Sequence, residues 1–169
     1  AAKQATSTLP IVMVNSLEAV KRGLVASLAH PGANVTGRTS MGWEREPMRL
    51  KLLTEAVPGR SRIAVLWCTA APGSAAPVQP GGLEWKDMQF AATVLGVQLQ
   101  RLEVREQDDL ERAYAAALSA HAEALFVRPC YFHHINWRNL ERVVDFTATH
   151  RLPAIYDSRE FVYAGGLMS

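Results

Sequence analysis

The sequence is poor in cysteine and in net charge. Its two cysteines, Cys68 and Cys130, cannot form a framework of several disulfide bonds, and they are too few for a structural zinc site without histidine. The net charge of +2 is too small to indicate nucleic-acid binding. The most basic segment, from Arg45 to Lys51, also contains glutamate, so the sequence predicts a solvated helix face there.

Long apolar runs are also missing. No stretch approaches the roughly 20 apolar residues that a membrane-spanning helix needs. The chain begins without the charged and then apolar start of a signal peptide, and residues 165–169 read as the middle of an element. We therefore expect both ends to be cut from a longer protein, and the missing signal says little about location.

The composition that is present is that of a soluble globular chain. Hydrophobic residues make up 49% of the 169 residues and charged residues 20%. Short apolar runs alternate with amphipathic segments. The expected strands lie at 9–14, 34–37, 62–68, 97–104, 124–127 and 153–156. The expected helices lie at 18–29, 44–57, 88–95, 110–118 and 140–147, the fourth of them capped by Asp108.

This alternation predicts the fold class. Strands that alternate with helices form βαβ units with right-handed crossovers, which gives an α/β fold with a doubly wound parallel sheet. The segment 97–104 alternates apolar and polar residues, as a strand near a sheet edge does. The helix at 44–57 lies between two groups of strands. We therefore expect residues 1–40 to form part of a first lobe, and residues 41–169 a second, three-layer lobe truncated at its C-terminus.

Several stretches of the chain, taken together and in order, resemble a known family. They are Ile11–Met13, Gly23–Ala29 with Pro31–Gly32, Asn34–Gly37, Leu50–Leu53, Val57–Gly59, Arg62–Trp67, His150–Tyr156, Arg159–Val162 and Ala164–Ser169. They are similar to the ABC-transporter solute-binding proteins with the type I periplasmic-binding-protein fold, in the branch that includes tryptophan and tyrosine binders. The resemblance covers nearly the whole chain and implies an incomplete two-lobe architecture, the middle of a longer protein.

The resemblance also implies a function. It implies capture of a small organic solute, such as an aromatic amino acid, between two lobes, without catalysis and without a cofactor. The expected partners are the small-molecule ligand and the ABC permease, with no nucleic acid. The full-length protein would be periplasmic or extracytoplasmic, and a lipid anchor absent from this chain would be its contact with the membrane. Because a cleft needs both lobes, we expect weak or absent binding by the 169-residue chain alone.

Three loops depart from the family pattern. Leu17-Glu18-Ala19 stands where the family usually has Gly-Asp-Pro, the loop from Cys68 to Ser74 replaces an Asn-Pro-rich loop, and Pro129-Cys130 replaces Pro-Asp. All three follow the carboxyl ends of strands, where ligands bind in open α/β sheets. We therefore expect either a ligand different from the usual one or a copy that has lost binding.

The candidate ligand-binding residues lie in or next to these loops. They are Ser16, Glu18, Cys68, Thr69, Ser74, Cys130, Tyr131, Tyr156 and Asp157. Each has a structural alternative: Tyr156 could pack under a loop, Glu18 could complement a helix dipole, and Thr69 or Ser74 could cap a turn.

The two cysteines leave several interpretations open. In a doubly wound sheet, the first and third strands of the second lobe are neighbours, so Cys68 and Cys130 are expected near each other. They could form a disulfide bond, remain two half-buried thiols, or join His133 or His134 in a metal site. A thiol pair that moves a proton at a substrate carbon needs one thiol on each side of the substrate, and here both come from one lobe. We predict no catalytic and no metal-binding residues.

Three function classes therefore remain. The first is solute binding for transport, the second is a ligand-sensing regulatory domain of the same fold, and the third is a cysteine-dependent enzyme. The sequence does not name the ligand, because the loops that would specify it are those that depart from the family.

Overall fold

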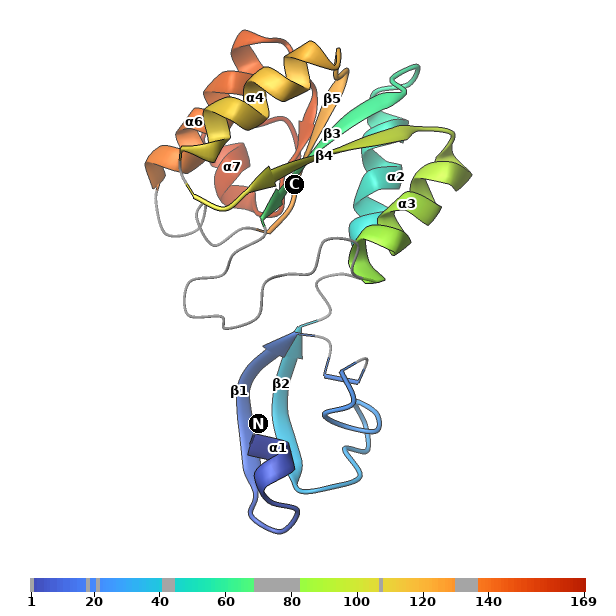
Figure 1. The fold of residues 1–169 in the computed structure, drawn as a ribbon, viewed down its shortest axis with the longest axis vertical. Coiled ribbons are helices and arrows are strands. Elements are labelled where there is room, and N and C mark those ends of the chain that lie inside the picture. Colours follow the sequence, from blue (N-terminus) through green and yellow to red (C-terminus); the bar gives the residue numbers. More distant parts are fainter. Residues whose placement is uncertain are drawn as a thin grey trace. The chain divides into compact units, whose positions relative to one another are not determined.

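The chain forms two compact units, Ala1–Arg45 and Glu46–Ser169 (Figure 1). The computed structural model describes residues 2–17, 19–20, 22–40, 45–68, 83–106, 108–129 and 137–169. The assignment of the two units to two lobes of a solute-binding protein stays a prediction.

The first unit is built on a two-stranded parallel sheet. It contains α1 (Ala2–Ala5), β1 (Ile11–Leu17) and β2 (Val35–Ser40). Met13 pairs with Gly37, and the register then shifts before Ser16 pairs with Thr39, which marks a β-bulge in β1. Gly37 has φ +130°, and a Cβ at this position would overlap the backbone of Met13. Only glycine fits this close approach.

The helix predicted at 18–29 is wrong: the described residues of this range form turns and bends. Gly23 adopts a left-handed conformation with φ +65°. The Gly23 N–H donates to the Val20 carbonyl and the Leu24 N–H to the Ala19 carbonyl, both at 2.8 Å. This pair of bonds is the Schellman pattern, which closes a helical turn and stops it. The apolar spacing therefore belongs to a folded loop that packs Ala19 and Val25 against Val35.

The second unit is a doubly wound α/β layer, as the sequence predicts. Its strands form one parallel sheet in the order β4-β3-β5-β6. They are β3 (Arg62–Cys68), β4 (Gln98–Val104), β5 (Ala124–Val127) and β6 (Ala154–Ile155). The helices are α2 (Glu46–Ala56), α3 (Leu83–Leu95), α4 (Asp109–Ser119), α6 (Trp137–Thr149) and α7 (Arg159–Tyr163). As expected, β4 lies at the edge, and the first and third strands of this unit, β3 and β5, are neighbours.

Helices cover both faces of this sheet. In Figure 1, α2 and α3 lie on one face and α4, α6 and α7 on the other. Alternate residues of β3 supply the two cores: Ile63, Val65 and Trp67 belong to the core with α2 and α3, and Ala64 and Leu66 to the other. Five consecutive buried residues explain why this strand reads as a continuous apolar run.

Asp108 occupies the predicted N-cap position of α4. The Asp108 side chain makes no capping hydrogen bond. Instead, one carboxylate oxygen of Asp109 accepts the backbone N–H of Arg105 at 2.7 Å and that of Glu106 at 3.2 Å. The bond from Arg105 is the main reason that the pKa of Asp109 lies below its ordinary value. Within the described ranges, no helix is both long and apolar enough to cross a membrane.

Candidate functional site

The candidate site is the carboxyl edge of the second unit's sheet. Because the four strands are parallel, their carboxyl ends share one edge. The chain leaves β3 toward β4 on one side and returns to β5 on the other, so the topological switch point lies between β3 and β5. Cys68 ends β3, and Arg128 directly follows β5.

A buried ion cluster, consisting of Glu46, Arg49 and Arg128, lies at this edge. Glu46 is the first residue of α2 and is only 3% exposed. One of its carboxylate oxygens accepts a hydrogen bond from Arg49 Nη1 at 3.1 Å, and the other accepts one from Arg128 Nε at 3.2 Å. Arg49 Nη2 also donates to the backbone carbonyl of Val127 at 2.9 Å. The start of α2 is thereby connected to the end of β5.

Burial dominates the electrostatics of this cluster. Desolvation raises the pKa of the Glu46 carboxyl, although Arg49 and Arg128 both favour its charged form. Desolvation likewise lowers the pKa of Arg49, opposed by Glu46 and by Asp157. The predicted solvated face is therefore wrong for Glu46 and Arg49. On the same helix it does hold for Lys51, whose ammonium lies 3.7 Å from the carboxylate of Glu55 in an exposed pair.

Trp67, in β3, is the aromatic residue of this edge. It is fully buried, and the guanidinium carbon of Arg128 lies 3.7 Å from its ring centroid. The guanidinium carbon of Arg101, from β4, lies 4.7 Å from the same ring, and Trp85 packs against it edge to face at 5.2 Å. These distances are within the range of cation–π attraction, so the ring holds both guanidinium groups in place.

The predicted site residues belong to both units, and several lie outside the described residues. Asp157 lies half-buried just after β6, and its charge favours the protonated form of Arg49. Ser16 lies half-buried in the first unit, where its carbonyl accepts a hydrogen bond from the Thr39 hydroxyl at 2.9 Å. Glu18, Thr69, Ser74, Cys130 and Tyr131 lie outside the described residues. Their ligand-binding roles stay predictions.

Tyr156 packs in the core of the second unit. It is 1% exposed, and its ring stacks on Phe161 with centroids 4.8 Å apart. Its phenol oxygen lies 2.7 Å from the hydroxyl oxygen of Thr147. Burial raises the pKa of this phenol. Both contacts are with helices, Thr147 in α6 and Phe161 in α7, and the ligand-binding role of Tyr156 stays a prediction.

Cys68 is half-buried and disulfide-bonded. Cys130, which is the only other cysteine of the sequence, lies outside the described residues. A sulfur held in a disulfide has no thiol that could take up or release a substrate proton. Within the part of the chain that the structure describes, no group of three or more metal-ligating side chains comes together.

Sequence reasoning did not select Trp67, Arg128 or the start of α2. A positional signal for Arg128 was nevertheless present, because it directly follows the buried run Ala124–Val127 at the switch point. The same rule selected Cys130, two residues later. For Glu46 no local signal exists, since its partner Arg128 is 82 residues away.

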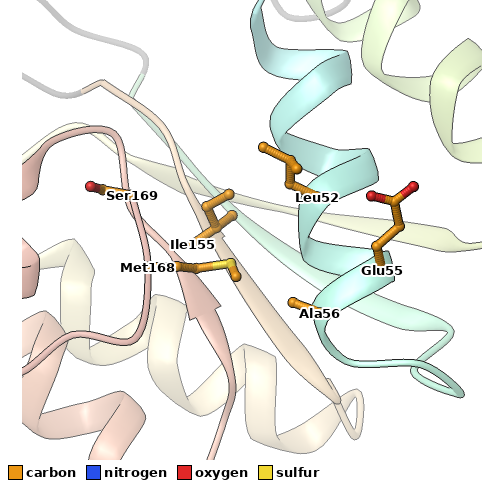
Figure 2. Close-up of a pocket in the computed structure, with 6 residues that line it drawn as sticks. All are labelled: Leu52, Glu55, Ala56, Ile155, Met168 and Ser169. Carbon is orange, nitrogen blue, oxygen red and sulfur yellow. The ribbon is translucent and has the colours of Figure 1, made fainter.

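A separate apolar groove of about 360 Å³ lies between α2 and the end of the chain. Figure 2 shows the residues that line it, which are Leu52, Glu55, Ala56, Ile155, Met168 and Ser169. Met168 forms a parallel bridge with Ile155, and its carbonyl accepts the Tyr156 N–H at 2.9 Å. None of the predicted ligand-binding residues lines this groove.

Solved structures of other proteins have a fold similar to that of this chain. The chain is similar to the ABC domain in complex with L-Trp from Streptococcus pneumonia, with 18% identity and a TM-score of 0.69 over 98% of this chain and 52% of that one. It is also similar to a conserved domain protein from Vibrio cholerae, with 20% identity and a TM-score of 0.65 over 98% of this chain and 52% of that one. A third structure is the ligand-free, open form of a substrate binding protein with adhesive properties from Clostridium difficile, with 18% identity and a TM-score of 0.59 over 92% of this chain and 48% of that one.

These identities show the fold alone, and the chain spans about half the length of the solved structures it matches. A search of curated protein sequences finds no significant match. The model of the ABC transporter substrate binding proteins, however, matches residues 1–169. The chain therefore belongs to the family of ABC transporter substrate binding proteins, as its sequence motifs predict.

Proposed function

We propose that this chain is part of the solute-binding component of an ABC transporter and contributes the carboxyl edge of its second unit to the binding site. The observation that carries the proposal is the switch point between β3 and β5, since open α/β sheets bind ligands in the crevice at this position. Family membership supports the solute-binding role. Because the chain spans half of its solved relatives, the activity belongs to the longer protein.

The first unit supports an origin in a larger lobe. Val12 and Val14 of β1 are 70% and 88% exposed, although parallel sheets are normally covered on both faces. A two-stranded parallel sheet with one small core is too small to be stable in isolation. Further chain in the longer protein would cover this apolar face.

Aromatic amino acids are the first candidates for the ligand. One solved relative is a complex with L-Trp, which motivates the choice but does not transfer to this chain at 18% identity. The alternatives are other small organic solutes, because the loops at the edge depart from the family pattern. The permease partner and the extracytoplasmic location, with a lipid anchor outside this chain, follow from the family as proposals.

The test is a thermal-shift screen of the full-length protein with the twenty amino acids and aromatic acids. A compound at a hundred times its Kd stabilises the folded state by about 2.7 kcal/mol, which is readily measured. We expect Asp157→Asn, at the edge, to reduce the shift produced by an amino acid, and Asp145→Asn, at an exposed position on α6, to leave it unchanged. A screen in which no compound raises the Tm contradicts the solute-binding proposal.

The two other function classes are less well supported. A ligand-sensing domain shares the fold, but the matching family model describes transport proteins. A cysteine-dependent enzyme would need a free thiol, whereas Cys68 is disulfide-bonded. A helix-turn-helix or kinase segment in the full-length sequence would favour the sensor.

A further inference from the structure

We propose that Glu46 is a positioning residue, which ties the point where the chain enters the second unit to the carboxyl edge of that unit's sheet. The inference deepens the proposed solute-binding function and rests on it only for its last step. Its basis is the geometry of the buried ion cluster.

Glu46 occupies a special place in the chain. It is the first residue of the second unit and the first residue of α2. A segment that connects two units has to be fixed at its end if a movement in one unit is to be passed to the other. At this end, the fixing contact is the Glu46 carboxylate.

The tie has two contacts with the end of β5, and both depend on Glu46. Glu46 reaches Arg128, which follows β5, at 3.2 Å, while Arg49 reaches the carbonyl of Val127, the last residue of β5, at 2.9 Å. The carboxylate also holds Arg49 at 3.1 Å. The first turn of α2 is thus connected twice to the end of one strand.

The tie continues to the neighbouring strand through Arg128. Its guanidinium carbon lies 3.7 Å from the ring centroid of Trp67, the next-to-last residue of β3. The cluster therefore connects α2 with both strands at the switch point. A displacement of the Arg128 side chain would therefore change its cation–π contact with Trp67 and its hydrogen bond with Glu46 at the same time.

Energetics favour a positioning role over a purely stabilising one. The Glu46 carboxylate is desolvated, and burial raises its pKa despite two arginines. The desolvation cost of a buried ion pair commonly offsets its Coulomb attraction, so replacing the whole cluster by well-packed apolar side chains would stabilise the fold to a similar degree. Hydrogen bonds to charged groups do fix the relative geometry of their partners. In the proposed function, a solute that contacts Arg128 would change how firmly the start of α2 is held.

The test compares Glu46→Gln with Glu55→Gln in the full-length protein. Glu55 is the matched control because it is a glutamate of the same helix in an exposed pair with Lys51. The first readout is the emission of Trp67, obtained by difference from the same proteins carrying Trp67→Phe. The second is hydrogen exchange of the first hydrogen-bonded turn of α2, with α6 as the internal reference.

We expect Glu46→Gln to shift the Trp67 emission and to speed exchange in the first turn of α2 about tenfold, with α6 unchanged. Glu55→Gln should change neither quantity. If Glu46→Gln does not fold, Arg128→Lys replaces it, because lysine keeps the charge but loses the planar stacking group. Unchanged emission and exchange overturn the proposal, and so does exchange that rises equally in α2 and α6.

The last step is tested with L-tryptophan as the probe. We expect its affinity to change in Glu46→Gln and not in Glu55→Gln, and equal affinities in both variants refute the link to binding. If L-tryptophan does not bind the wild type, the ligand proposed above is wrong. The tie itself is still decided by emission and exchange, which need no ligand.

Discussion

Replacing Tyr156 by phenylalanine separates its structural role from a role in binding. The Thr147 hydroxyl donates its one hydrogen to the Val144 carbonyl at 2.8 Å. The bond of 2.7 Å between the two hydroxyl oxygens must therefore use the hydrogen of Tyr156, with Thr147 as the acceptor. Tyr156→Phe removes this single donor and leaves the ring, its stacking on Phe161 and its burial in place.

The expected cost is small and specific. One buried hydrogen bond between neutral groups contributes about 1 kcal/mol. Thr147→Val should cost more, about 2 kcal/mol, because it leaves the buried Tyr156 hydroxyl without its acceptor. In the double variant that hydroxyl is gone, so we expect the two effects to fall short of additivity by about 1 kcal/mol.

The assay is urea unfolding of the four proteins, together with Tyr163→Phe as a control. Tyr163 is 75% exposed, so its hydroxyl should contribute nothing measurable. For a unit of this size, 1 kcal/mol corresponds to a decrease in Tm of about 3–6 °C. Additive effects would refute the hydrogen bond. A Tyr156→Phe variant of wild-type stability that loses ligand affinity would show that the phenol acts in the binding site instead.

Three further predictions concern other parts of the chain. Glu123 accepts the backbone N–H groups of Ser61 and Arg62, which is the main reason that its pKa in the folded protein lies below its ordinary value. Its contribution to stability is therefore present above the unfolded pKa and is lost as pH falls through the folded pKa. Glu123→Gln should flatten the acid side of a stability-against-pH curve, and an unchanged curve counts against this reasoning. We expect Cys68 to pair with Cys130, and a disulfide that closes a loop of about 60 residues stabilises the folded state by about 4 kcal/mol. Reduction of this disulfide should therefore lower the Tm. Alkylation of either cysteine before reduction would refute the pairing. Gly37→Ala should speed hydrogen exchange in β1 while the second unit keeps its Tm, since a Cβ would overlap the backbone of Met13; protection of β1 equal to wild type would contradict this.

Strands β3 and β5 of the second unit could be predicted from the sequence because they are buried over nearly their whole length. β3 matches the expected range 62–68, and β5 the range 124–127. A strand covered on both faces needs apolar side chains at successive positions, and the sequence displays this as a continuous run. The edge position of β4 was predicted from its alternating apolar and polar residues, and only Leu102 and Val104 of this strand are buried.

The conformation of residues 18–29 could not be predicted from the spacing of their apolar residues. Helical spacing of apolar residues also occurs in a folded loop that buries Val25 and Ala19. Gly23 was the distinguishing residue, since its left-handed conformation stops the turn. From sequence alone, a glycine at this position is also compatible with a helix interior, where it is less favourable than alanine by about 1 kcal/mol.

The ion cluster could not be predicted for a different reason. Charged residues are rarely buried, so Glu46 and Arg49 were assigned to solvent. Their burial depends on the end of β5 lying next to the start of α2, a contact between residues 82 positions apart. No local pattern encodes such a partner. The rule that ligands bind at carboxyl ends located the edge, but it does not specify which side chains face it.

In the proposed function, the charge balance of four side chains at this edge affects which kind of solute would bind. Glu46 carries one negative charge against the positive charges of Arg49 and Arg128, and Asp157 adds the second negative charge beside Arg49. These four side chains therefore sum to zero. A site that attracts a dianion needs an excess of positive charge, which the four do not provide. A zwitterion such as an amino acid carries no net charge, so its binding does not require an excess of positive charge. Replacing Asp157 by asparagine leaves an excess positive charge, so it should shift the preference from amino acids toward carboxylic acids without an amino group.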